Sequence, residues 1–157
     1  MSLFRFIASD NVLPEIDLSG FQKLKVRDIK KITPLPRGPV PWEELDDDVE
    51  VLYAADESEL GGLHISVCNN PPDRLDDYIT RKNVYWLERN IDERWKNQIK
   101  EYLFNNIQKG NRIELWSIWF GSGFVLEDKI RKRINFSQIN SFDYELLNKP
   151  FCCIFIE

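Results

Sequence analysis

Hydrophobic and polar positions alternate in several short stretches, as they do in strands that bury one face. Phe4–Ala8 predicts a first strand and Leu24–Ile29 predicts a second. Val49–Ala55 and Leu63–Cys68 alternate most regularly, and a polar stretch ending in two glycines separates them. We therefore predict that these last two stretches pair as a hairpin.

The C-terminal part of the chain adds further extended stretches. Arg112–Phe120 is rich in β-branched and aromatic residues on both faces, which is typical of a central strand. Gly121-Ser122-Gly123 predicts a turn, and Phe124–Leu126 predicts a return to extended chain. Ile130–Phe136 alternates like an amphipathic strand, and Phe151–Ile156 predicts a final apolar strand.

A helical period replaces the alternation in the middle of the chain. Apolar residues three or four positions apart predict a long amphipathic helix over about 90–109. They are Ile91, Trp95, Ile99, Tyr102, Leu103 and Ile107. Asn90 is the expected N-cap and Gly110 the expected stop. The spacing of Leu75, Tyr78 and Ile79 predicts a shorter helix over about 73–87.

These elements predict an α+β fold. We expect a mainly antiparallel sheet of about five to seven strands, with both helices packed on it. The length of 157 residues predicts a single domain over 1–157. Thr33–Pro41, with four prolines, is expected to be extended chain within that domain. Met1-Ser2-Leu3 resembles the residues that an expression vector adds.

Charge is distributed unevenly along an acidic chain of net charge −5. No Lys or Arg occurs from Gly38 to Pro72, where many acidic residues fall. Such an acidic chain repels phosphate backbones, so nucleic acid is a disfavoured partner and a basic protein is a favoured one.

The cysteines and the hydropathy indicate where the protein works. Cys68, Cys152 and Cys153 are an odd number, and adjacent cysteines on a strand point to opposite faces. A reducing compartment fits this content. No apolar run approaches the roughly 18 residues that span a bilayer. We therefore expect a cytoplasmic protein without a membrane partner.

Candidate chemistry is sparse. The single histidine, His64, would stand about 13 Å from Cys68 on one strand face, too far for a catalytic dyad. The acidic residues of 46–57 match a calcium loop in part, but Val51 takes the place of its glycine. We therefore predict no catalytic residue, no metal site and no cofactor, and we favour a non-enzymatic role.

The leading hypothesis is a protein-interaction domain, of the inhibitor or immunity kind, that binds a basic partner. Acidic side chains accelerate association with a basic surface, and aromatic side chains supply anchoring contacts. The residues expected to form this surface are Trp42, Glu43, Glu44, Asp46, Asp47, Asp48 and Tyr53.

Two alternatives remain open. The first is a ligand-binding domain or enzyme with an aromatic pocket lined by Trp116, Trp119 and Phe124. The second is a nucleic-acid-associated accessory protein that uses the cations of 129–133 beside Phe136.

Overall fold

The computed structural model describes residues 2–121 and 129–157. Contacts divide the chain into two compact units, which are described separately. Unit 1 comprises Met1–Leu18 and Gly61–Glu157, and unit 2 comprises Ser19–Leu60. Unit 2 is therefore an insertion in the sequence of unit 1. The expectation of a single domain over 1–157 stays a prediction.

Unit 1 contains a seven-stranded sheet in the order β2-β5-β6-β1-β7-β9-β8. Its strands are β1 (Ser2–Ser9), β2 (Ile16–Asp17), β5 (His64–Val67), β6 (Asn83–Glu88), β7 (Ile113–Phe120), β8 (Ile130–Ile134) and β9 (Cys152–Ile156). All neighbouring strands run antiparallel except β8 and β9, which run parallel. The predicted α+β class and the mainly antiparallel sheet are confirmed.

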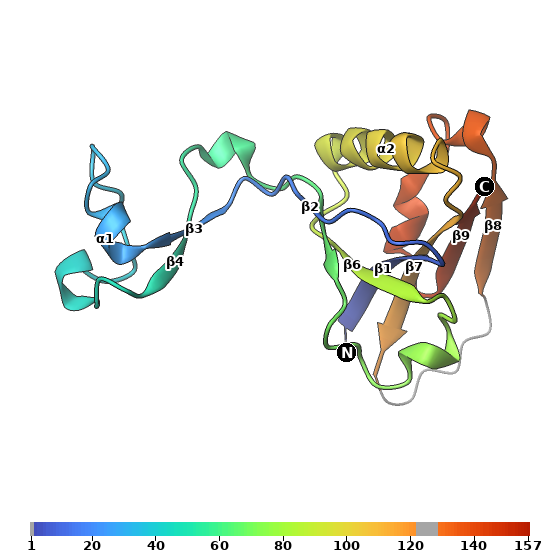
Figure 1. Ribbon diagram of the computed structural model, residues 1–157, viewed down its shortest axis with the longest axis horizontal. Helices are drawn as coiled ribbons and strands as arrows, with labels where there is room; N and C mark the ends of the chain where they lie inside the picture. The colour runs from blue at the N-terminus through green and yellow to red at the C-terminus, as the bar shows by residue number, and fades with distance from the viewer. Residues whose placement is uncertain (1, 122–128) are drawn as a thin grey trace. The chain divides into compact units, whose positions relative to one another are not determined.

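Helix α2 (Glu93–Ile107) packs across one face of this sheet (Figure 1). Its buried Trp95, Ile99 and Leu103 lie at helical spacing and meet the sheet side chains Ile7 and Leu115. The predicted long helix is confirmed, with a shorter span than expected.

The ends of α2 show which residues define a helix boundary. The carboxylate of Asp92 accepts a hydrogen bond from the Trp95 backbone N–H at 2.8 Å, so Asp92 is the N-cap and the expected cap Asn90 was wrong. Gly110 has a φ of 80° and follows the helix, as predicted for a C-terminal stop.

A second core cluster covers the other face of the sheet. Its buried members are Phe6, Ala8, Leu75, Ile79, Ile118 and Phe151. Leu75 and Ile79 belong to the segment that connects β5 to β6, which lies on the side of the sheet away from α2 (Figure 1). Both faces of the central strands are therefore buried, which explains the apolar character of β7 on both sides.

The predicted shorter helix over 73–87 was wrong. Only Leu75–Asp77 is helical, as the single 3-10 turn η3, and Asn83–Glu88 forms β6. Strand β6 lies between β5 and β1, where Tyr85 and Leu87 enter the core under α2. The alternating burial of this segment is the period of a strand, which outweighs the short helical spacing that precedes it.

The predicted hairpin of Val49–Ala55 with Leu63–Cys68 was also wrong, although both stretches contain strands. β4 (Glu50–Tyr53) pairs with β3 (Gln22–Lys25), whereas β5 pairs with β6 and β2. Burial of apolar side chains within each unit selects these partners, because Leu24 faces Val51 in the core of unit 2.

Unit 2 is built on the β3–β4 pair. It also contains α1 (Val26–Ile29), η1 (Trp42–Glu44) and η2 (Glu57–Glu59). The strand predicted over Leu24–Ile29 ends at Lys25, where Val26 and Ile29 turn into the core as one helical turn. Trp42 completes that core, and the proline-rich segment before it packs against the Trp42 ring.

Two further 3-10 helices complete unit 1, η4 (Phe136–Gln138) and η5 (Tyr144–Asn148). The strand predicted over Ile130–Phe136 therefore ends at Ile134. The stretch Phe124–Leu126 lies outside the described residues, as do Ser122 and Gly123. Among the described residues, no helix has the length and apolar character needed to cross a membrane.

Candidate functional site

The predicted partner surface lies in unit 2, but its two aromatic residues are not free on that surface. Trp42 is only 8% exposed, and its Nε1 donates a hydrogen bond to the Pro36 carbonyl at 2.6 Å. Tyr53 is half-buried and packs against the same core. Both rings therefore hold unit 2 together.

Two of the predicted acidic residues are neutralised within unit 2. Asp47 accepts a hydrogen bond from Lys30 Nζ at 2.6 Å, and this contact lowers the pKa of the Asp47 carboxyl. Asp48 lies 3.4 Å from Lys25 Nζ and also pairs with Arg27. These pairs connect the basic stretch 23–31 with the acidic stretch 46–48.

The remaining acidic residues of the predicted surface are available. Glu43, Glu44 and Asp46 are exposed, and within the described residues no cation lies in ion-pair range of them. One Asp46 carboxylate oxygen accepts the Asp48 backbone N–H at 2.8 Å, which orders the turn before β4. The structure thus separates the predicted acidic residues into an unpaired set and a paired set.

Unit 2 carries most of the net negative charge. It has ten acidic and six basic side chains, against a net charge of −5 for the whole chain. It also exposes large apolar side chains, and Leu52 on the outer side of β4 is 64% exposed. The others are Leu35, Val40 and Val49.

The predicted aromatic pocket is only partly formed. Trp116 and Trp119 are half-buried against the second core cluster, whereas Phe124 lies outside the described residues. Trp116 borders a cavity of about 50 Å³, far below the roughly 300 Å³ at which ligand pockets begin. Its Nε1 donates to Glu114 Oε2 at 2.9 Å.

Glu114 is the centre of a buried polar network that sequence patterning did not reveal. It is only 6% exposed, and its Oε1 lies 2.6 Å from Arg81 Nε. Arg81 also pairs with Asp10 at 2.7 Å. This network joins β7 and the segment before β6 to Asp10, directly after β1, and so connects three parts of unit 1.

A larger cavity, of about 620 Å³, lies elsewhere in unit 1. It is bordered by the end of β5, the start of β6 and the long connection between them. All of its lining residues fall between Val67 and Tyr85, but no motif in that stretch predicts a cavity. The available signal was the long connection with Pro71-Pro72, since long ordered loops in compact domains are commonly functional.

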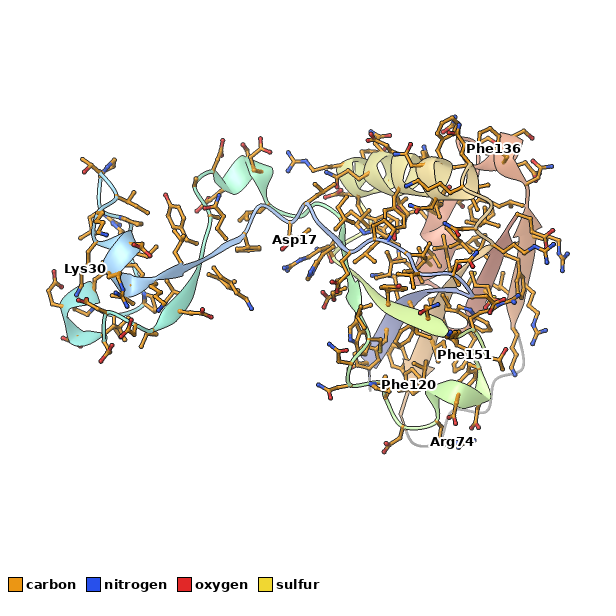
Figure 2. All side chains as sticks on the ribbon, in the orientation of Figure 1. Asp17, Lys30, Arg74, Phe120, Phe136 and Phe151 are labelled. Carbon is orange, nitrogen blue, oxygen red and sulfur yellow. The ribbon has the colours of Figure 1, made fainter. Side chains whose placement is uncertain are left out.

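The basic stretch at β8 does not combine with Phe136. Arg131 and Arg133 alternate with Lys132 on the strand, so their charges point to both faces. Arg133 pairs with Glu157 at 3.1 Å. Phe136 instead stacks on Phe104 with ring centroids 4.8 Å apart, at the end of α2 (Figure 2).

His64 has a structural partner. Its Nδ1 lies 2.6 Å from Glu88 Oε2, across the β5–β6 pair in which the two residues are opposite. Within residues 2–121 and 129–157, no group of three His, Cys, Asp or Glu side chains is placed to hold a metal ion.

Comparison with known proteins adds no further assignment, because no family model, no curated protein and no solved structure matches the chain.

Proposed function

We propose that this protein acts by binding another protein, and that the acidic surface of unit 2 recognises a basic surface of that partner. The observation that carries the proposal is the concentration of negative charge in one small inserted unit. Ten acidic side chains gather in Ser19–Leu60. Complementary charge steers two proteins together and disfavours partners of like charge.

Glu43, Glu44 and Asp46 are the residues that meet the partner in this proposal. They are exposed and carry no internal ion pair within the described residues, so binding does not first require an existing pair to break. Asp47 and Asp48 have a different role, since their cations hold α1 and β3 against the turn before β4.

The exposed apolar side chains support the same proposal. Unit 2, which the structure describes throughout, buries only three apolar side chains, Val26, Ile29 and Trp42. Leu52 and Val49 remain exposed beside the acidic residues along the chain. A partner that covers them would add burial energy to the electrostatic attraction, as in interfaces with an apolar centre and a charged rim. An inhibitor or immunity role fits this mode of binding.

The test compares three forms of the full chain as baits in a lysate of the native host. The first is the wild-type protein and the second is E43Q/E44Q/D46N. The third, D73N/D76N/E101Q, removes three exposed acidic charges from unit 1. It serves as the matched control, since these residues also have no ion-pair partner within the described residues.

The expected result is a protein that wild type and control capture at low salt, that elutes as salt rises, and that the unit 2 variant does not capture. The captured protein is then purified and mixed with each form to show direct binding. Equal capture by all three forms would contradict the proposed surface, and so would loss of capture by the control alone.

A further inference from the structure

The cavity of about 620 Å³ in unit 1 has the size of a small-molecule site, for which roughly 300–1,000 Å³ is typical. It lies where the long segment between β5 and β6 leaves the sheet and returns to it. Arg74 in this segment adopts a left-handed φ of 66°. Figure 2 shows Arg74 with Phe120 on the side of the sheet away from α2.

The wall of this cavity combines polar groups with preformed apolar side chains. Leu75, Ile79 and Tyr85 are buried in the two core clusters and also line the cavity. Val84 packs against the same cluster as Leu75 and Ile79, and Val67, which lies opposite Tyr85 on β6, is 42% exposed at the wall. Fixed apolar side chains of this kind take up a ligand without a large cost of ordering the protein.

The charged residues of the cavity balance one another. Asp73 and Asp76 contribute two negative charges, whereas Lys82 and Arg74 contribute two positive charges. Arg74 is already engaged, because its Nε lies 2.7 Å from Asp77. Since Asp77 neutralises Arg74, the wall carries no excess of positive charge, and it offers no reason to prefer an anionic ligand over an uncharged one.

We infer that this cavity is a binding site for an uncharged, partly apolar small molecule. The site is independent of the acidic surface of unit 2, and either proposal can fail without the other. The apolar part of the wall supplies affinity in proportion to the apolar surface that the ligand buries.

Cys68 provides a reporter inside the site. It lines the cavity and is half-buried, whereas Cys152 and Cys153 are buried. Burial raises the pKa of the Cys68 thiol, so less of it is the reactive thiolate at neutral pH, while its partial exposure leaves it accessible to a thiol reagent. A ligand in the cavity would slow this reaction, and a dye on another surface would not.

The test uses the neutral fluorophore N-phenyl-1-naphthylamine and its sulfonated analogue, 1-anilinonaphthalene-8-sulfonate, with the full chain. The account predicts saturable binding of the neutral dye with one molecule per chain and a dissociation constant on the order of 100 μM or tighter. It also predicts that the neutral dye slows modification of Cys68, and that the sulfonate binds no more tightly than the neutral dye.

Two matched variants locate the bound dye. V67W places a large side chain at the cavity wall and should weaken binding by about tenfold or more. V12W makes the same substitution at a residue that is 78% exposed and does not line the cavity, and should leave binding unchanged. Unreactive Cys152 and Cys153 show that each variant is folded.

Saturable binding with protection of Cys68, lost in V67W and retained in V12W, would establish the site. Absence of saturable binding would overturn the inference. Binding that leaves Cys68 unprotected, or that V67W does not weaken, would place the dye elsewhere and would also overturn it. Tighter binding of the sulfonate would overturn the assignment of an uncharged ligand.

Discussion

Lys30 Nζ lies 2.6 Å from a carboxylate oxygen of Asp47, and this pair connects α1 with the acidic turn before β4. Acidic residues that are adjacent in the sequence therefore have different roles. Asp47 is held by a cation of its own unit, whereas Glu43 and Glu44 have no such partner among the described residues. Fewer acidic side chains of unit 2 are available to a partner than the sequence alone suggests.

The first prediction concerns the titration of Asp47. Its pKa is lowered chiefly by the hydrogen bond from Lys30. A carboxyl whose pKa is lowered on folding adds stability above its unfolded pKa, and this stability is lost as pH falls through the folded value. The carboxyl carbon of Asp47, followed by NMR, should titrate below the ordinary aspartate range. K30M should return it towards that range.

K31M is the control for that titration. Lys31 lies 3.5 Å from Asp28 and does not pair with Asp47, so its loss should leave the titration of Asp47 unchanged. An ordinary pKa for Asp47 in the wild-type protein would refute the assigned ion pair.

The second prediction distinguishes the observed helix cap from the expected one. D92A removes the carboxylate that accepts the Trp95 N–H and should cost about 1 kcal/mol of unfolding free energy. N90A should change the unfolding free energy by less than about 0.5 kcal/mol, because the Asn90 side chain does not cap α2. Urea unfolding curves measure both, and a larger loss for N90A would contradict the cap.

The third prediction tests the buried network around Glu114. E114Q removes the charge that faces Arg81 and the Trp116 indole, and should lower the unfolding free energy by about 2 kcal/mol. E101Q makes the same change on the exposed side of α2 and should have little effect. Equal unfolding midpoints for the two variants would show that the network contributes nothing to stability.

The fourth prediction ranks the three thiols. Burial raises the pKa of Cys152 to about 11, so this thiol is almost entirely protonated and shielded at neutral pH. The native protein should therefore incorporate one maleimide per chain, at Cys68, and C68S should incorporate none until urea unfolds the chain. Mass spectrometry counts the adducts. Rapid labelling of Cys152 in the native protein would contradict the burial of β9.

Local patterns predicted much of the fold. The spacing of Trp95, Ile99 and Leu103 specified α2 because one stripe of a helix must face the sheet, and the alternation in Phe4–Ala8 specified β1. The same patterns were insufficient for Asn83–Glu88, where aromatic residues on both faces follow a segment of helical spacing. A strand buried on both faces resembles a helix segment in sequence.

Pairing between strands could not be predicted from the same patterns. β4 and β5 are neighbours in the chain, yet Leu24 pairs with Val51 and Ile65 pairs with Leu87. Partner choice depends on which side chains share a core, and that information is spread over the whole chain. The ion pair between Lys30 and Asp47 arises from such a contact between separate stretches of the chain, so no local motif predicted it.

The association rate of the purified partner, measured as a function of ionic strength, tests the proposed role of unit 2 most directly. The account predicts that the association rate of the wild-type protein falls steeply as salt rises. E43Q/E44Q/D46N should lower the rate at low salt by about tenfold or more and make it less dependent on salt. D73N/D76N/E101Q should behave like wild type. An association rate that is unchanged when Glu43, Glu44 and Asp46 are neutralised would contradict the acidic surface of unit 2 as the site of recognition.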